Sequence, residues 1–121
     1  MTAPSNIAAD VIGLLYSRRF PLAHEKETQA EIGQAFEAAA LPFEREVDIG
    51  KRDIIDFLVR EKIGVEVKIG GSKRNIYAQC TRYCRTKRLD VLILATSVPT
   101  GFPEEIEGVP CYVVSLGRAW L

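Results

Sequence analysis

The sequence lacks the features of a membrane-spanning or secreted protein. No apolar run in its 121 residues approaches the roughly 20 residues that a membrane helix needs. The first ten residues have neither the basic region nor the apolar region of a secretory signal. Internal repeats, low-complexity segments and linkers are also missing. These absences favour a single domain over residues 1–121, with no membrane partner and the cytoplasm as its compartment.

Cysteine and histidine are scarce. The cysteines are Cys80, Cys84 and Cys111, and their odd number argues against a disulfide framework. Cys80 and Cys84 are four residues apart, as two zinc ligands on one helical turn could be. However, His24 is the single histidine, and a zinc site needs about four ligands. The cysteines are therefore predicted to be small buried side chains.

Net charge is also absent, since 16 basic residues balance 16 acidic ones. The charges are nevertheless segregated. Residues 68–88 contain seven basic side chains and no acidic one, whereas residues 25–48 contain seven acidic and two basic side chains. A neutral chain with such a basic stretch can present a phosphate-binding face. The same stretch also fits an ordinary solvated helix surface.

The hydrophobic pattern predicts an α/β fold. Helices are expected at 7–16, 24–40 and 73–86, and strands at 43–49, 54–59, 63–69, 90–96 and 111–115. One helical turn is expected at 104–107. Three sequential strands favour an antiparallel meander, and the helix before the fourth strand favours a parallel crossover. The expected result is a mixed central sheet flanked by helices.

The first expected strand, 43–49, alternates between apolar and charged residues. This period of two places Phe43, Val47 and Ile49 on one face of the strand. Arg45 falls on that apolar face and is the exception to the pattern. The period of two therefore predicts a strand over residues 43–49.

Three residues in the next two strands could perform chemistry. Asp56 interrupts the apolar strand 54–59, where an unpaired carboxylate is unfavourable. Glu66 and Lys68 are two residues apart in strand 63–69 and therefore share a face. A hairpin would bring Asp56 and Glu66 nearly opposite each other, and such carboxylates repel unless a cation such as Mg²⁺ or Mn²⁺ lies between them. Lys68 could then act on a water or a phosphate. Taken alone, the Glu-x-Lys pair also fits an exposed sheet face.

This pattern resembles the PD-(D/E)XK nuclease superfamily. Asp56 is followed after nine residues by Glu66-Val67-Lys68, across an expected hairpin. The αβββαβ order over residues 24–96 is similar to the restriction-endonuclease-like core of that superfamily. Ile55 stands where a proline often precedes the aspartate.

The resemblance implies specific roles for these residues. Asp56, Glu66 and Lys68 would be catalytic, and Asp56, Glu66 and Val67 would hold Mg²⁺ or Mn²⁺. A glutamate on the first core helix often joins the site in this superfamily. At about 100° per residue, Glu25 falls near the apolar stripe of that helix, and Glu27 and Glu31 point away from it. Glu25 is therefore the preferred fourth catalytic and metal-binding residue. The alternative is that Glu25 precedes the helix and is solvated.

The second core helix carries a further similarity. Gln79 and Tyr83 resemble the Gln-x-x-x-Tyr motif of the RecB-like branch, and their spacing places them on one helix face. The alternative is that Tyr83 belongs to the core and Gln79 is incidental. The residues expected to bind nucleic acid are Gln79, Tyr83, Lys73, Arg74, Arg82 and Arg85.

The resemblance implies a Mg²⁺-dependent nuclease, similar to RecB-like nucleases and Holliday-junction resolvases, that hydrolyses DNA phosphodiester bonds. Structure-selective or weakly sequence-selective cutting is expected, and a homodimer and a phage or mobile-element origin are suggested by analogy. An RNA substrate stays open, because the sequence holds no motif that decides between RNA and DNA. The alternative from a different class is a catalytically idle module that binds DNA or a protein partner. The zero net charge favours that alternative, whereas the retained Asp56, Glu66 and Lys68 oppose it.

Overall fold

Six strands form one mixed sheet in the computed structural model, which describes residues 4–118. The strands are β1 (Phe43–Asp48), β2 (Ile54–Val59), β3 (Ile63–Lys68), β4 (Val91–Thr96), β5 (Glu105–Ile106) and β6 (Val109–Ser115). Their order in the sheet is β1-β2-β3-β4-β6-β5. The meander β1–β2–β3 is antiparallel, whereas β3 pairs with β4, and β4 with β6, in parallel. Short turns permit the first arrangement, and the helical crossover from β3 to β4 permits the second. Both predictions are confirmed.

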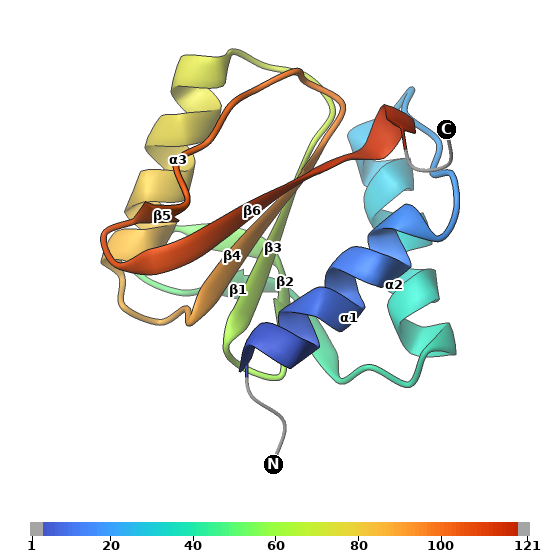
Figure 1. Cartoon of the computed structure of the whole chain (residues 1–121), viewed down its shortest axis with the longest axis horizontal. Coiled ribbons are helices and arrows are strands. Elements are labelled where there is room, and N and C mark those ends of the chain that lie inside the picture. The colour runs from blue at the N-terminus through green and yellow to red at the C-terminus, as the bar shows by residue number, and fades with distance from the viewer. Residues whose placement is uncertain (1–3, 119–121) are drawn as a thin grey trace.

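Helices cover the two faces of the sheet (Figure 1). Helices α1 (Pro4–Tyr16) and α2 (Glu25–Ala38) pack on one face, and α3 (Lys73–Arg85) packs on the other. A short 3₁₀ helix, Leu116–Arg118, follows β6. Each face of the sheet therefore has its own core. Within the described part of the chain, every helix is too short or too polar to span a bilayer.

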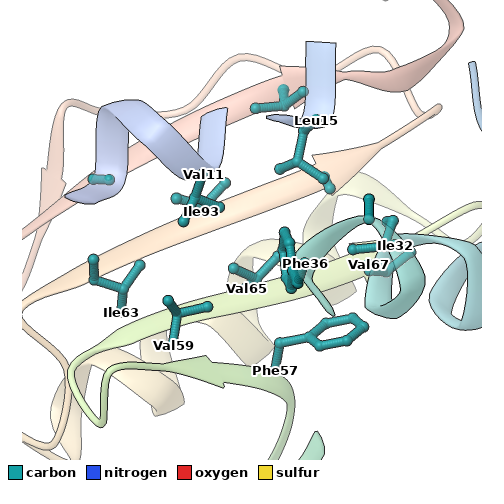
Figure 2. Packing of buried hydrophobic residues seen from close by; sticks show 14 of the residues in the cluster. Val11, Leu15, Ile32, Phe36, Phe57, Val59, Ile63, Val65, Val67 and Ile93 are labelled. Carbon is teal, nitrogen blue, oxygen red and sulfur yellow. The ribbon is translucent and has the colours of Figure 1, made fainter. Parts of the chain in front are cut away.

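The core between α1, α2 and the sheet is formed by large apolar side chains (Figure 2). Phe36 of α2 packs edge-on against Phe57 of β2, with ring centroids 5.3 Å apart. Val65 and Val67 of β3 lie in the same core. The side chains that alternate with these valines on β3 face α3, because successive side chains of a strand point to opposite faces. The alternation predicted for this strand is confirmed, and it directs Glu66 and Lys68 toward α3.

The predicted helical turn at 104–107 is wrong. Glu105 and Ile106 form the short strand β5, and Ile106 pairs with Val109 of β6. Glu107 and Gly108 connect the two strands with φ angles of 52° and 82°. Two-residue hairpin turns with positive φ at both positions match the twist of the paired strands. The glycine therefore marks a hairpin turn rather than a helix.

The face predicted for strand 43–49 is also wrong. Phe43 packs against the core of α2, whereas Val47 and Ile49 pack against the core of α3. Glu46 has a φ of 52°, which is outside the extended region and breaks the period of two. The strand therefore changes face in its middle. This change occurs beside the part of β2 that carries Asp56.

Candidate active site

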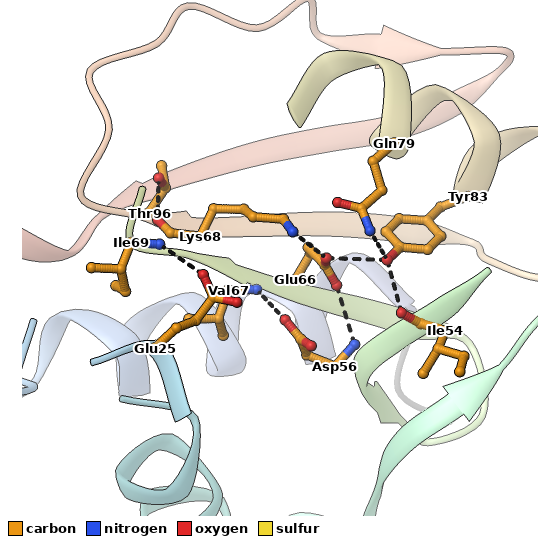
Figure 3. A network of polar contacts seen from close by, with 10 residues as sticks. All are labelled: Glu25, Ile54, Asp56, Glu66, Val67, Lys68, Ile69, Gln79, Tyr83 and Thr96. Atoms are coloured by element: carbon orange, nitrogen blue, oxygen red, sulfur yellow. Dashed lines mark hydrogen bonds and ion pairs between the residues drawn. The ribbon is translucent and has the colours of Figure 1, made fainter. Parts of the chain in front are cut away.

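Strands β2 and β3 separate where their acidic residues lie. The β2–β3 ladder ends at the pair Phe57 and Val65. Beyond it, the N–H of Asp56 donates to Oε1 of Glu66 at 3.2 Å, and the N–H of Val67 donates to Oδ2 of Asp56 at 2.7 Å. The carboxylates thus occupy the positions that backbone carbonyls hold in a regular ladder. They lie together between β2 and β3 (Figure 3), as the hairpin register predicted.

Glu66 is buried, with 2% of its surface exposed. Its Oε2 lies 3.4 Å from the ammonium of Lys68 and 3.1 Å from the hydroxyl of Tyr83. Burial and the negative charge of Asp56 raise the pKa of Glu66 to about 8, although Lys68 lowers it in part. Near neutral pH, Glu66 therefore holds a proton when no cation is present. The alternative of an exposed surface pair is wrong, because Glu66 is inside the protein.

Asp56 is half-buried beside Glu66. Burial raises the pKa of Asp56, while the N–H of Val67 opposes that effect. The negative charge of Glu25 also raises the pKa of Asp56. The pKa values of both carboxyl groups stay raised although the ammonium of Lys68 lies nearby, so burial and mutual repulsion outweigh that positive charge. A divalent cation with oxygen ligands fits such a pair.

Lys68 lies at the opening of the site. Its side chain is 22% exposed, and its ammonium is next to Glu66. The carbonyl of Lys68 accepts a hydrogen bond from the hydroxyl of Thr96 at 2.6 Å. Sequence reasoning missed Thr96, which pairs with Lys68 in the β3–β4 ladder. A polar residue at the end of the apolar strand β4 was the available signal.

The structure places Tyr83 in the core, with none of its surface exposed. Its hydroxyl accepts from Nε2 of Gln79 at 2.8 Å and lies 2.8 Å from the carbonyl oxygen of Ile54. The same hydroxyl contacts Glu66 (Figure 3). The side chain of Tyr83 faces the core and not solvent, and the predicted direct contact between Tyr83 and DNA stays a prediction. The Gln79–Tyr83 pair positions Glu66.

Of the three candidate glutamates, Glu25 lies at the site. It is the first residue of α2, and its Oε1 accepts from the N–H of Ile69 at 3.2 Å. Glu27 is exposed, and Glu31 pairs with Arg18 at 3.1 Å. Within residues 4–118, however, no three histidine, cysteine, aspartate or glutamate side chains converge so that they could hold a metal ion. Glu25 is thus beside the Asp56–Glu66 pair and not grouped with it.

The basic residues of α3 fall into two groups. Lys73 and Arg74 are exposed in its first turn. Arg82 pairs with Asp53 at 3.2 Å, and Arg85 pairs with Glu107 at 3.4 Å. Exposed pairs of this kind contribute about 0–1 kcal/mol. These ion pairs therefore add little to stability, and both arginine side chains stay largely exposed.

The three cysteines are free and buried, as predicted. Burial raises the pKa of Cys80 to about 12, so its thiol is protonated. A protonated buried thiol is a poor metal ligand. All three cysteines pack in the core between α3 and the sheet, and the charge of Glu66 acts on Cys80.

Comparisons of the chain with protein-family models, with curated proteins and with solved structures gave no match. The functional assignment therefore depends on the geometry of the site. That geometry is a buried carboxylate pair with a lysine at its opening and a tyrosine behind it.

Proposed function

We propose that this protein is a metal-dependent nuclease of the PD-(D/E)XK type, with a restriction-endonuclease-like core, that hydrolyses DNA phosphodiester bonds. The observation that carries the proposal is the buried pair of Asp56 and Glu66 between the separated strands β2 and β3. Burying two carboxylates side by side is costly unless they serve a bound cation or a shared proton.

Asp56 and Glu66, with Val67 as a main-chain contributor, would hold Mg²⁺ or Mn²⁺. When bound, the ion would supply Lewis-acid polarisation of a phosphate and a water of lowered pKa. Glu25 contributes negative charge next to Asp56. Its proposed role is to strengthen the attraction for the cation from a neighbouring position.

Lys68 is the proposed catalytic cation. Its ammonium lies beside Glu66 and is partly open to solvent, so it can contact both a phosphate and the acidic pair. A positive charge at this point stabilises the negative charge that develops on the phosphate oxygens. Tyr83 and Gln79 hold Glu66 in place from behind, which keeps the carboxyl group oriented during the reaction.

The basic residues of α3 are the proposed contacts to the DNA backbone. Lys73 and Arg74 are exposed in the first turn, and no ion pair involves either of them within residues 4–118. Phosphate contacts of this kind give affinity without reading sequence. This supports structure-selective or weakly sequence-selective cutting.

A second candidate is a catalytically idle module that binds DNA or a protein partner. The observation that favours it is that no third acidic side chain joins Asp56 and Glu66 in the described residues. This candidate requires the carboxylate pair to have a purely structural role. It predicts nucleic-acid or protein binding that does not depend on a divalent cation.

A cleavage panel separates the two candidates. Linear, nicked, flap and four-way-junction DNA would be incubated with the protein and Mg²⁺ or Mn²⁺, with EDTA as the metal-free arm. The nuclease proposal expects cleavage that is lost in EDTA and in Asp56→Asn. Lys62→Ala, an exposed change in the β2–β3 turn, is the matched control and should cut normally. Calorimetry would measure binding of Mg²⁺ or Mn²⁺ in parallel. Metal binding without cleavage of any DNA in the panel would overturn the proposal.

A further inference from the structure

A hollow lined by basic side chains lies between the β1–β2 turn and the last turns of α3. Its volume is about 400 Å³. Lys51 comes from the turn, and Arg82 and Arg85 come from the helix. Asp53 is the acidic residue in the lining, and Glu107 pairs with Arg85 from outside it, so three cations face two acids. Cations that outnumber acids around a concave surface attract an anion.

The two arginines of the hollow keep most of their hydrogen-bonding capacity. Arg82 and Arg85 form their ion pairs through Nε, and their side chains are 54% and 64% exposed. A guanidinium has further N–H donors, arranged as a fork that matches two oxygens of a phosphate. An incoming phosphate can therefore bind them while the ion pair with Asp53 still holds Arg82 in position.

The turn that carries Lys51 has an unusual backbone. Lys51 and the following Arg52 have φ angles of 45° and 73°, a left-handed conformation that costs roughly 1–2 kcal/mol per residue. Two hydrogen bonds at 2.9 Å fix the turn, one from Gly50 N–H to Asp48 and one from Asp53 N–H to the Gly50 carbonyl. Arg60 and Glu61 in the β2–β3 turn have the same left-handed conformation, so this backbone holds Lys51 in position and does not by itself mark a binding site.

Two contacts of α3 connect the hollow with the carboxylate pair. Arg82 and Tyr83 are consecutive on α3. The first contacts Asp53 in the hollow, and the second contacts Glu66. Asp53 also precedes Asp56 by three residues, which is roughly 10 Å along extended chain. A nucleic-acid strand with one phosphate at the carboxylate pair can therefore place a neighbouring phosphate in the hollow.

We propose that this hollow binds a backbone phosphate of the substrate strand, with Lys51, Arg82 and Arg85 as its ligands. The inference rests on the proposed nuclease function, and it adds Lys51 and the β1–β2 turn to the nucleic-acid interface. The hollow holds the strand on one side of the reacting phosphate. The α3 surface at Lys73 and Arg74 is a separate contact.

The test is binding of a labelled single-stranded DNA oligonucleotide, measured by fluorescence anisotropy in EDTA over a range of salt concentrations. The test variant is Lys51→Asn with Arg85→Gln, because asparagine tolerates a left-handed φ. The control is Arg60→Asn with Lys62→Gln, which removes two charges from the exposed β2–β3 turn. Arg60 has a φ of 49°, so the two variants are matched in backbone strain. Circular dichroism would verify that both variants are folded.

The test variant should bind about ten-fold more weakly than wild type near 0.1 M salt. The slope of log K against log salt concentration should be less steep by about 1.4, because two phosphate contacts are lost. The control should bind like wild type. Equal affinity and slope in the two variants would overturn the phosphate hollow. Binding that depends on the hollow, without cleavage in Mg²⁺ or Mn²⁺, would overturn the nuclease proposal and leave the hollow standing. If wild type cleaves DNA and the test variant binds it normally, the phosphate hollow is overturned and the nuclease proposal stands.

Discussion

Raising the pH of the metal-free protein is expected to destabilise it through Glu66. Burial and Asp56 raise the pKa of this side chain from 4.5 to about 8. Between these values the folded protein holds a proton that the unfolded chain has released. The stability is therefore fully present below the unfolded pKa, and it is lost as the pH rises through the folded pKa.

The magnitude follows from the two pKa values. Each pH unit in that interval corresponds to about 1.4 kcal/mol. From about pH 5 to about pH 8, the free energy of unfolding should fall by roughly 3–4 kcal/mol, since Glu66 is already half-ionised at the upper end. This is a large part of the total stability of a typical domain. The raised pKa of Asp56 acts in the same direction.

The assay is urea denaturation at a series of pH values in EDTA, for wild type and for Glu66→Gln. The glutamine variant has no titrating group at this position. Its free energy of unfolding should therefore decrease much less than that of wild type over the same pH range. Glu27→Gln, an exposed change on α2, is the control and should follow wild type. Mg²⁺ at about pH 8 should restore stability to wild type only, because the cation binds the ionised pair. The same pH dependence in wild type and Glu66→Gln would refute the reasoning.

Three further predictions address individual side chains. Lys68→Ala should leave folding and metal binding nearly intact and lower the cleavage rate by about 10²-fold or more; a variant that cuts as fast as wild type removes Lys68 from the mechanism. Asp56→Asn retains an oxygen acceptor for the N–H of Val67, so the metal-free protein should unfold at the same or a higher urea concentration. Calorimetry with Mn²⁺ should detect weaker binding to this variant, and unchanged binding contradicts the metal site. Tyr83→Phe removes a hydrogen bond that lowers the pKa of Glu66, so it should cost about 1–2 kcal/mol of stability. Metal binding should strengthen as Glu66 ionises, and in this variant that increase should occur at higher pH. A loss of stability without that shift would give Tyr83 a purely structural role.

Local patterns in the sequence were sufficient to predict the central part of the site. The strict alternation in β3 placed Glu66 and Lys68 on one face, and the turn around Glu61 fixed the register that brings Asp56 opposite Glu66. Both inferences depend only on the two-residue period of a strand and on the length of a hairpin turn. The helical period likewise singled out Glu25 from its neighbours Glu27 and Glu31. Short-range geometry therefore determined that Asp56 and Glu66 meet, whereas Glu25 lies beside them.

The tertiary structure alone decided how deeply these residues are buried and what else they contact. The spacing of Gln79 and Tyr83 indicated a shared helix face, but not that this face turns inward and bonds Glu66. The partners of Arg82 and Arg85 lie 29 and 22 residues away in the chain, beyond any local pattern. The left-handed φ of Glu46, which changes the face of β1, has no signal in its residue type. Burial, ion pairing and backbone strain depend on contacts between distant segments, and these contacts form only when the helices close over the sheet.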